Sequence, residues 1–160
     1  MFFYYTKVTT IVTNRQIMST ILDEIRIRSD GAKTVMRIVI ADDSDDYREA
    51  LVHAIDGCPD LSVVGAARNG AELIAICNAE HPDIAMTDLR MPVVDGISAI
   101  REISKESPRT LLVAFSTANS APIRHEALAA GAHIFFPKDQ AMVALRSLSK
   151  AYEDHFRDAI

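Results

Sequence analysis

Short apolar runs alternate with segments of helical periodicity along most of the chain. The runs occupy residues 37–41, 61–66, 84–86, 111–115 and 133–136, and apolar residues recur at helical spacing after each of them. Strict strand–helix alternation predicts a parallel sheet with right-handed crossovers and helices on both faces. We therefore expect an α/β fold with a doubly wound, five-stranded parallel sheet. The strand order 2-1-3-4-5 is the flavodoxin-like order of this fold type.

Capping residues and helix breakers predict where the helices begin and end. We expect Ser44 to cap the first helix, the third helical pattern to start at Ile97, and Asp139 to cap the last helix. Asn69 and Gly70 form a turn signal before the second helix. The last helix carries apolar residues at helical spacing: Val143, Leu145, Leu148, Tyr152 and Phe156.

Residues 1–35 do not continue the alternation. A candidate amphipathic helix covers residues 14–28, with Ile17, Ile21 and Ile25 on one face. This segment is either an extra helix that packs on a partner or a second copy, or upstream sequence. In the second interpretation the domain proper occupies residues 36–160.

Composition narrows the class of protein. The chain has 160 residues, of which 49% are hydrophobic, and a net charge of −5, which disfavours the basic patch of a nucleic-acid-binding protein. Cys58 and Cys77 have no metal-binding or redox spacing, which favours two ordinary thiols in a reducing compartment. No apolar run approaches the length of a membrane span, and the first residues lack the features of a secretory signal. We expect a cytoplasmic protein that binds neither nucleic acid nor membrane directly.

Polar side chains stand where four of the predicted strands end. They are Asp42 and Asp43, then Asp88, then Ser116, then Lys138. Carboxyl ends of parallel strands converge at one edge of a sheet, where ligands bind.

This cluster has a chemistry of its own. Carboxylates a few ångströms apart repel one another by about 1 to 4 kcal/mol per pair, so they need a cation, and oxygen ligands suit Mg²⁺. Magnesium, the Ser116 hydroxyl and the Lys138 ammonium would together hold phosphoryl oxygens. Asp88, at the centre, is then the natural nucleophile.

Several motifs in order resemble one known family. They are residues 38–43, Asp88-Leu89-Arg90-Met91-Pro92 with Asp95-Gly96, Phe115-Ser116, Ala130-Gly131-Ala132 and residues 135–139. Together they resemble the receiver domain of two-component response regulators, over residues 36–160. The Asn69-Gly70 step and Lys138-Asp139 are most similar to the subfamily usually joined to a helix-turn-helix output domain.

The resemblance implies a role for each site residue. Asp88 would accept a phosphoryl group from a sensor histidine kinase or a histidine phosphotransfer protein. Asp43 and Asp88 would bind Mg²⁺, with Asp42 acting through water and the backbone carbonyl of Arg90 completing the shell. Ser116 would turn towards the phosphoryl group and Lys138 would pair with it. Such a protein is not a conventional enzyme, because it accepts a phosphoryl group and hydrolyses it slowly.

The resemblance also implies a switch. Phe135 occupies the position of the switch aromatic, which would turn inward when Ser116 moves. The output surface would comprise the fourth helix, the fifth strand and the fifth helix, which could also form a homodimer. Two departures from the family pattern stand out: Phe135 replaces the commoner tyrosine, and Pro137 precedes Lys138 where many receivers place proline after the lysine.

Other functions stay open at this stage. A degenerate receiver would bind partners without phosphorylation, although the complete acidic set argues against it. A haloacid-dehalogenase-type hydrolase would need an aspartate two residues after the nucleophile, where this chain has Arg90. A regulator truncated before a DNA-binding domain is the alternative to a stand-alone receiver. The closing helix, with no linker-like tail, slightly favours the stand-alone form.

Overall fold

The computed structural model describes residues 35–145 and residue 148. These residues belong to one of the two units into which the chain divides, Val35–Ile160. The candidate helix over residues 14–28 lies outside the described residues, as do Tyr152 and Phe156.

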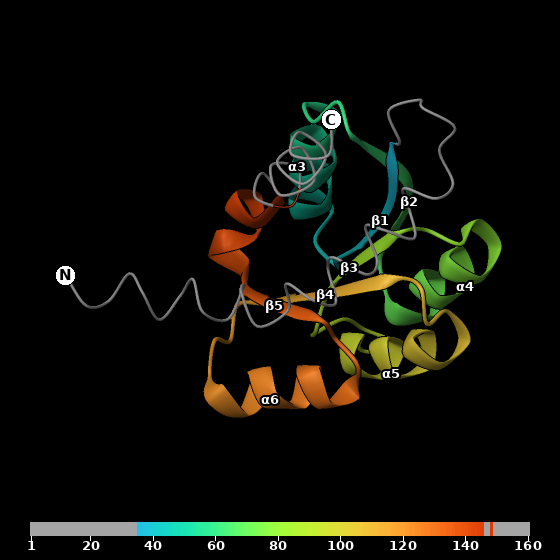
Figure 1. Cartoon of the computed structure of the whole chain (residues 1–160). Helices are drawn as coiled ribbons and strands as arrows, with labels where there is room; N and C mark the ends of the chain where they lie inside the picture. The colour runs from blue at the N-terminus through green and yellow to red at the C-terminus, as the bar shows by residue number, and fades with distance from the viewer. Residues whose placement is uncertain (1–34, 146–147, 149–160) are drawn as a thin grey trace, which may run out of the picture. The chain divides into compact units, whose positions relative to one another are not determined.

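Strands and helices alternate throughout the described part (Figure 1). In chain order they are β1 (Met36–Ala41), α3 (Asp45–Asp56), β2 (Leu61–Ala67), α4 (Gly70–Glu80), β3 (Ile84–Asp88), α5 (Gly96–Glu106), β4 (Leu111–Ser116), α6 (Ala121–Ala130), β5 (Ile134–Pro137) and the 3-10 helix η1 (Lys138–Gln140). Residues 141–145 and 148 are again helical. All strand pairs are parallel, and the order β2-β1-β3-β4-β5 confirms the predicted sheet.

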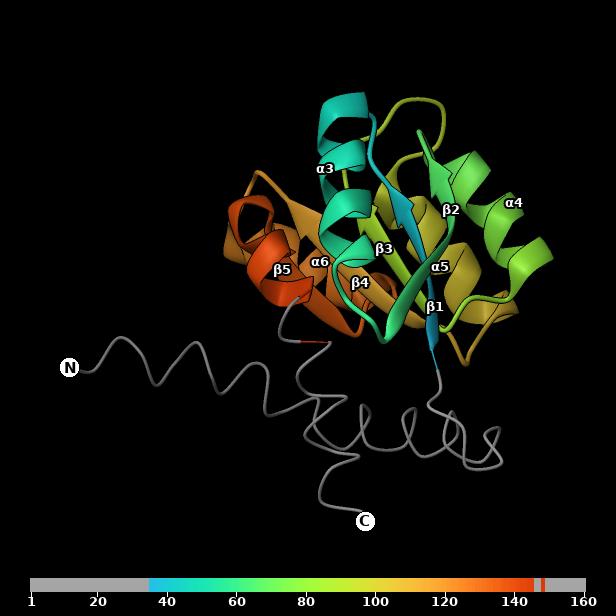
Figure 2. The same ribbon diagram turned by 90° about the horizontal axis from the view of Figure 1, so that it is seen from above.

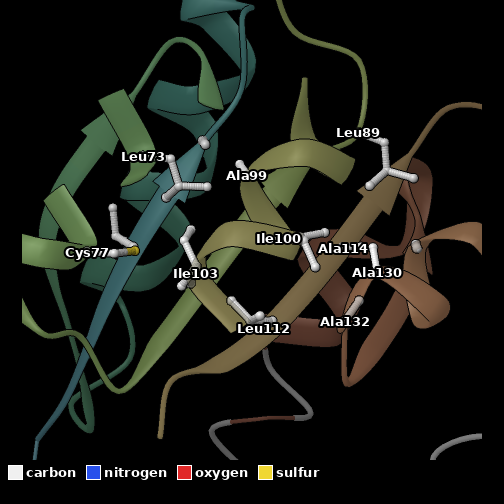
Figure 3. Packing of buried hydrophobic residues seen from close by; sticks show 14 of the residues in the cluster. Leu73, Cys77, Leu89, Ala99, Ile100, Ile103, Leu112, Ala114, Ala130 and Ala132 are labelled. Carbon is white, nitrogen blue, oxygen red and sulfur yellow. The ribbon is translucent and has the colours of Figure 1, made fainter. Parts of the chain in front are cut away.

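Helices cover both faces of the sheet, as predicted. Figure 2 shows α3 and the helical residues after η1 on one face, and α4, α5 and α6 on the other. Successive strand residues point to opposite faces. Val39, Ala85 and Leu112 therefore join one core cluster, in which Figure 3 shows Leu112 near Ile100 and Ile103 of α5. Their neighbours Ile38 and Met86 are fully buried on the other face. Burial on both faces explains why the strands read as continuous apolar runs.

Local hydrogen bonds define the helix starts. The hydroxyl of Ser44 accepts a hydrogen bond from the Tyr47 N–H at 3.3 Å, which confirms the predicted cap of α3. Asn69 caps α4 by accepting from the Glu72 N–H at 2.9 Å, so the turn signal marks a helix start. The third helix begins at Gly96, one residue before the predicted start, because Asp95 caps it.

The predicted cap at Asp139 is wrong. Asp139 lies inside η1, whose preceding residue is Pro137. The Ala141 N–H donates to the Lys138 carbonyl across three residues, so the chain makes a tight 3-10 turn before the helix continues. None of the helices in the described part of the chain is long and apolar enough to cross a membrane.

Lowering the pH should reduce the free energy of unfolding because His133 becomes protonated. This residue connects β4 to the start of β5. Its Nδ1 accepts a hydrogen bond from the Leu112 N–H at 2.9 Å, and burial lowers the pKa of this imidazole. The unfolded chain therefore binds a proton at higher pH than the folded chain, and the free energy of unfolding should fall as pH drops below about 6.5. Urea unfolding at several pH values should show a smaller fall in His133→Gln than in the wild type.

His125→Gln is the matched control, because His125 is exposed on α6. Its pH dependence should follow the wild type. An unchanged pH dependence in His133→Gln would show that the loss of stability in acid has another source.

Candidate functional site

Strand register brings the predicted polar residues to one edge of the sheet. Ala41 pairs with Thr87, Asp88 with Phe115, and Ser116 with Pro137. The residues just beyond these pairs, Asp42 and Lys138, therefore lie beside Asp88 and Ser116 at the carboxyl ends of the strands.

Three carboxylates form the acidic part of the site. Asp42, Asp43 and Asp88 each offer an oxygen, and these oxygens lie within 4.8 Å of one another. Asp42 is completely buried and Asp88 is 5% exposed, whereas Asp43 is exposed. Oxygen-only donors with one solvent-facing member fit a hard divalent cation that keeps several of its waters, such as Mg²⁺.

Asp42 is the most firmly held of the three. One carboxylate oxygen accepts from the Ser44 N–H at 2.9 Å, and the other lies 2.7 Å from the Lys138 ammonium. Its backbone is fixed as well, because its N–H donates to the Ala67 carbonyl and its own carbonyl accepts from the Arg48 guanidinium at 2.7 Å. These bonds connect β1 to α3 and β2 at the acidic edge.

Asp88 has a looser set of partners. One oxygen accepts from the Arg90 N–H at 3.4 Å, and the other lies 3.2 Å from the Lys138 ammonium. Burial raises the pKa of Asp88, while the nearby Lys138 charge opposes this rise. A buried carboxylate with few strong hydrogen bonds is available for coordination or covalent chemistry.

Lys138 brings a positive charge to the acidic cluster, 2.7 Å from Asp42 and 3.2 Å from Asp88. Burial alone would lower its pKa, but the close contact with the Asp42 carboxylate and the charge of Asp88 outweigh that effect and raise the pKa. Its ammonium lies 4.5 Å from the centre of the Tyr47 ring. The lysine is therefore held charged between two carboxylates and an aromatic face.

Tyr47 also belongs to the site, although the pattern of the sequence did not single it out. Its hydroxyl donates to the Lys138 carbonyl at 2.7 Å. Burial and the charges of Asp42 and Asp88 raise the pKa of Tyr47 to about 12, so the phenol stays protonated and can donate. The available signal was an aromatic residue one helical turn after Asp43.

Ser116 and Phe135 are both buried. In the described part of the chain, no observed hydrogen bond joins the Ser116 hydroxyl to Asp88. The Ser116 hydroxyl accepts a hydrogen bond from the Ala118 N–H at 3.2 Å, so its hydrogen bond lies within the loop that follows β4. The Phe135 ring belongs to the core beneath α6, and the guanidinium carbon of Arg124 lies 5.6 Å from its centre. The aromatic side chain therefore points inward in this structure.

Gly96 lets the loop after β3 fold tightly against Asp88. Its N–H donates to the Leu89 carbonyl at 3.0 Å. A Cβ at this position would overlap the Asp88 carbonyl oxygen and lie 2.8 Å from the Leu89 Cα. Only glycine permits this approach without moving the backbone of residue 88.

Comparisons with known proteins agree with the geometry. A family model described as the response regulator receiver domain matches residues 38–150. The receiver domain of the putative response regulator NarL from Mycobacterium tuberculosis superimposes with a TM-score of 0.69 at 30% identity, covering 75% of this chain and 98% of that one. The response regulator domain of Thermotoga maritima CheB gives 0.62 at 32% identity, covering 78% and 96%.

A curated relative points to the same domain. Protein-glutamate methylesterase/protein-glutamine glutaminase 1 of Saccharophagus degradans is 41% identical over 113 residues, which is 70% of this chain and 31% of that protein. The chain thus spans about a third of the length of such relatives. The predicted likeness to the helix-turn-helix subfamily stays a prediction.

Replacing Gly96 by alanine should damage both the fold and the site. The added methyl group must push the Asp88 backbone, so Gly96→Ala should lower the free energy of unfolding by about 1–3 kcal/mol. Chemical denaturation measures this loss, and the amide resonance of Asp88 should shift in the folded fraction.

Gly57→Ala is the control, since a Cβ there meets nothing closer than the Ala54 carbonyl oxygen at 3.6 Å. Its backbone is already helical, with φ of −76°. It should change stability by less than about 0.5 kcal/mol. Equal effects of the two substitutions would contradict the role given to Gly96.

Proposed function

Because the chain belongs to the receiver domain family of two-component response regulators, we propose that Asp88 is its phosphoryl acceptor. The donor would be a phosphohistidine of a sensor histidine kinase or a histidine phosphotransfer protein. The observation that carries the proposal is the buried Asp88 carboxylate, which lies among two further acids and 3.2 Å from the Lys138 ammonium. This arrangement suits phosphoryl transfer, in which positioning and charge stabilisation supply most of the catalysis.

The proposed step is an in-line displacement at phosphorus. A carboxylate oxygen of Asp88 forms the new O–P bond as the N–P bond to the donor histidine breaks. The electron pair of that bond stays on the imidazole nitrogen, and a proton already on the other ring nitrogen of the phosphohistidine lets the imidazole leave in a neutral form. Slow hydrolysis then releases inorganic phosphate and restores the carboxylate, so catalysis by this chain is limited to accepting and losing the group.

Asp42, Asp43 and Asp88, with the backbone carbonyl of Arg90, would hold Mg²⁺ in this mechanism. The ion supplies positive charge to the phosphoryl oxygens. Asp43 and Asp88 would be direct ligands, and Asp42, which already binds Lys138 at 2.7 Å, would act through water. The exposure of Asp43 supports this division, because an exposed ligand leaves room for coordinated waters.

The switch would require two side chains to leave their present partners. Ser116 would exchange the Ala118 N–H for a phosphoryl oxygen, and Lys138 would share its charge with the phosphoryl group. The phosphoryl group would thereby favour a second arrangement, to which Phe135 responds, by population shift.

We place the output surface on α6, β5 and the helix after η1. Leu128 on α6 is 41% exposed and Val143 in the following helix is 63% exposed, and these large apolar side chains support a protein-binding role. The partner would be another protein or a second copy of this chain rather than nucleic acid, since the net charge is −5. Free thiols at Cys58 and Cys77 support a cytoplasmic location.

Asp88→Asn should abolish the response to phosphoryl analogues. With Mg²⁺ and beryllofluoride, the wild type should show shifted amide resonances around Asp88, Ser116 and Lys138, because a carboxylate oxygen bonds to beryllium. An amide at residue 88 lacks the anionic oxygen, so the shifts should disappear. Light scattering on the same samples would report whether the active form is a homodimer.

Asp56→Asn is the control, because it removes an exposed carboxylate at the far end of α3. It should respond like the wild type. A full response in Asp88→Asn would mean that another residue accepts the group.

Asp43→Asn should weaken Mg²⁺ binding and stabilise the metal-free protein. Loss of one of three clustered charges should lower the Mg²⁺ affinity by about tenfold or more, measured by calorimetry. The same loss relieves repulsion, so thermal unfolding without Mg²⁺ should occur at a higher temperature. If the wild type fails to bind Mg²⁺ at millimolar concentration, the chain is a degenerate receiver.

A further inference from the structure

We propose that Tyr47 is a positioning residue that holds Lys138 where it can reach a phosphoryl group on Asp88. The inference rests on the proposed function, because it concerns the cation of that site. Tyr47 contacts Lys138 at both ends, through the backbone carbonyl and through the ammonium.

The first contact fixes the backbone of Lys138. The Tyr47 hydroxyl donates to the Lys138 carbonyl at 2.7 Å, across a separation of 91 residues. The same carbonyl accepts the Ala141 N–H that closes η1. Two donors on one carbonyl hold the turn that follows β5, and this turn carries the lysine.

The second contact limits where the ammonium can go. It lies 4.5 Å from the centre of the Tyr47 ring and 5.9 Å from that of Phe115, and the two rings are 5.9 Å apart. A lysine stem is flexible, and the nearby Asp42 and Asp88 compete for its charge. The ring face attracts the ammonium, and the ring itself fills space that the ammonium could otherwise enter.

Tyr47 is itself anchored close to the acids. Its N–H donates to the Ser44 hydroxyl at 3.3 Å in the cap of α3, and Ser44 also donates its N–H to Asp42. Tyr47 therefore links, through its backbone N–H and its side chain, the loop that carries the acidic pair to the loop that carries the lysine. The distance between Lys138 and the carboxylates is set in part by this link.

The alternative is a purely structural role, in which Tyr47 only packs between α3 and β4. Two substitutions separate these roles: Tyr47→Phe keeps the ring and loses the hydrogen bond, whereas Tyr47→Leu loses both contacts and stays apolar. Each is made alone and together with Lys138→Ala, in the full chain. The readouts are beryllofluoride affinity at saturating Mg²⁺, Mg²⁺ affinity alone, and thermal stability.

If Tyr47 positions Lys138, substitutions of Tyr47 should weaken beryllofluoride binding only when Lys138 is present. Tyr47→Leu should weaken beryllofluoride binding by about tenfold and Tyr47→Phe by about threefold, since each loses contacts of modest strength. Mg²⁺ affinity should change little, because Tyr47 touches no carboxylate oxygen in the observed contacts. In the Lys138→Ala background, Tyr47→Leu should cause no further loss, as expected for two residues that act through one another.

Ile55→Val is the control for destabilisation. Ile55 is fully buried on the same helix, and loss of one methyl group should lower stability without changing beryllofluoride affinity. The inference is overturned if Tyr47→Leu weakens beryllofluoride binding equally with and without Lys138, or leaves it unchanged in the presence of Lys138. If Lys138→Ala alone keeps the wild-type affinity, Lys138 does not reach the bound group and the role of Tyr47 fails, whereas the acceptor role of Asp88 is judged separately by Asp88→Asn.

Discussion

Negative charge concentrated at the carboxyl edge of the sheet is the constraint on which the rest of the site depends. Asp42 is completely buried and Asp88 nearly so, and both are within reach of one ammonium, that of Lys138. Burying a carboxylate is costly unless charge or hydrogen bonds compensate it. Each neighbouring feature of the edge supplies part of that compensation, from the Ser44 N–H at Asp42 to the Arg90 N–H at Asp88.

The negative charge of the buried carboxylates is only partly compensated, and this allows the site to bind a cation. Three acids and one lysine leave a local excess of negative charge that a divalent cation can neutralise. Lys138 lies closer to Asp42, at 2.7 Å, than to Asp88, at 3.2 Å. Both hydrogen bonds that Asp88 accepts are long, at 3.2 Å from Lys138 and 3.4 Å from the Arg90 N–H, so its buried charge is only weakly compensated.

The residues of the site differ in whether they already contact one another. The acids, Lys138 and Tyr47 already form a connected set of contacts, whereas the Ser116 hydroxyl bonds to its own loop and Phe135 packs inward under Arg124. The receiver therefore combines a preformed acidic cluster with a serine that would have to change its hydrogen-bond partner, while the aromatic ring of Phe135 already faces inward. A ligand that binds the second arrangement better can shift the population between the two.

The strand–helix alternation and the chemistry of the strand ends were determined by the sequence itself, because both depend on local patterns, whereas the strand order was expected from the fold type. Apolar runs buried on two faces predicted the strands, and Ser44 predicted the start of α3. Tertiary structure decided what depends on distance and burial: the closer pairing of Lys138 with Asp42, the turn that makes Asp139 part of η1, and the bond from Tyr47 to a residue 91 positions away. Such partners are chosen by strand register and by the low dielectric of the interior, neither of which a local pattern records.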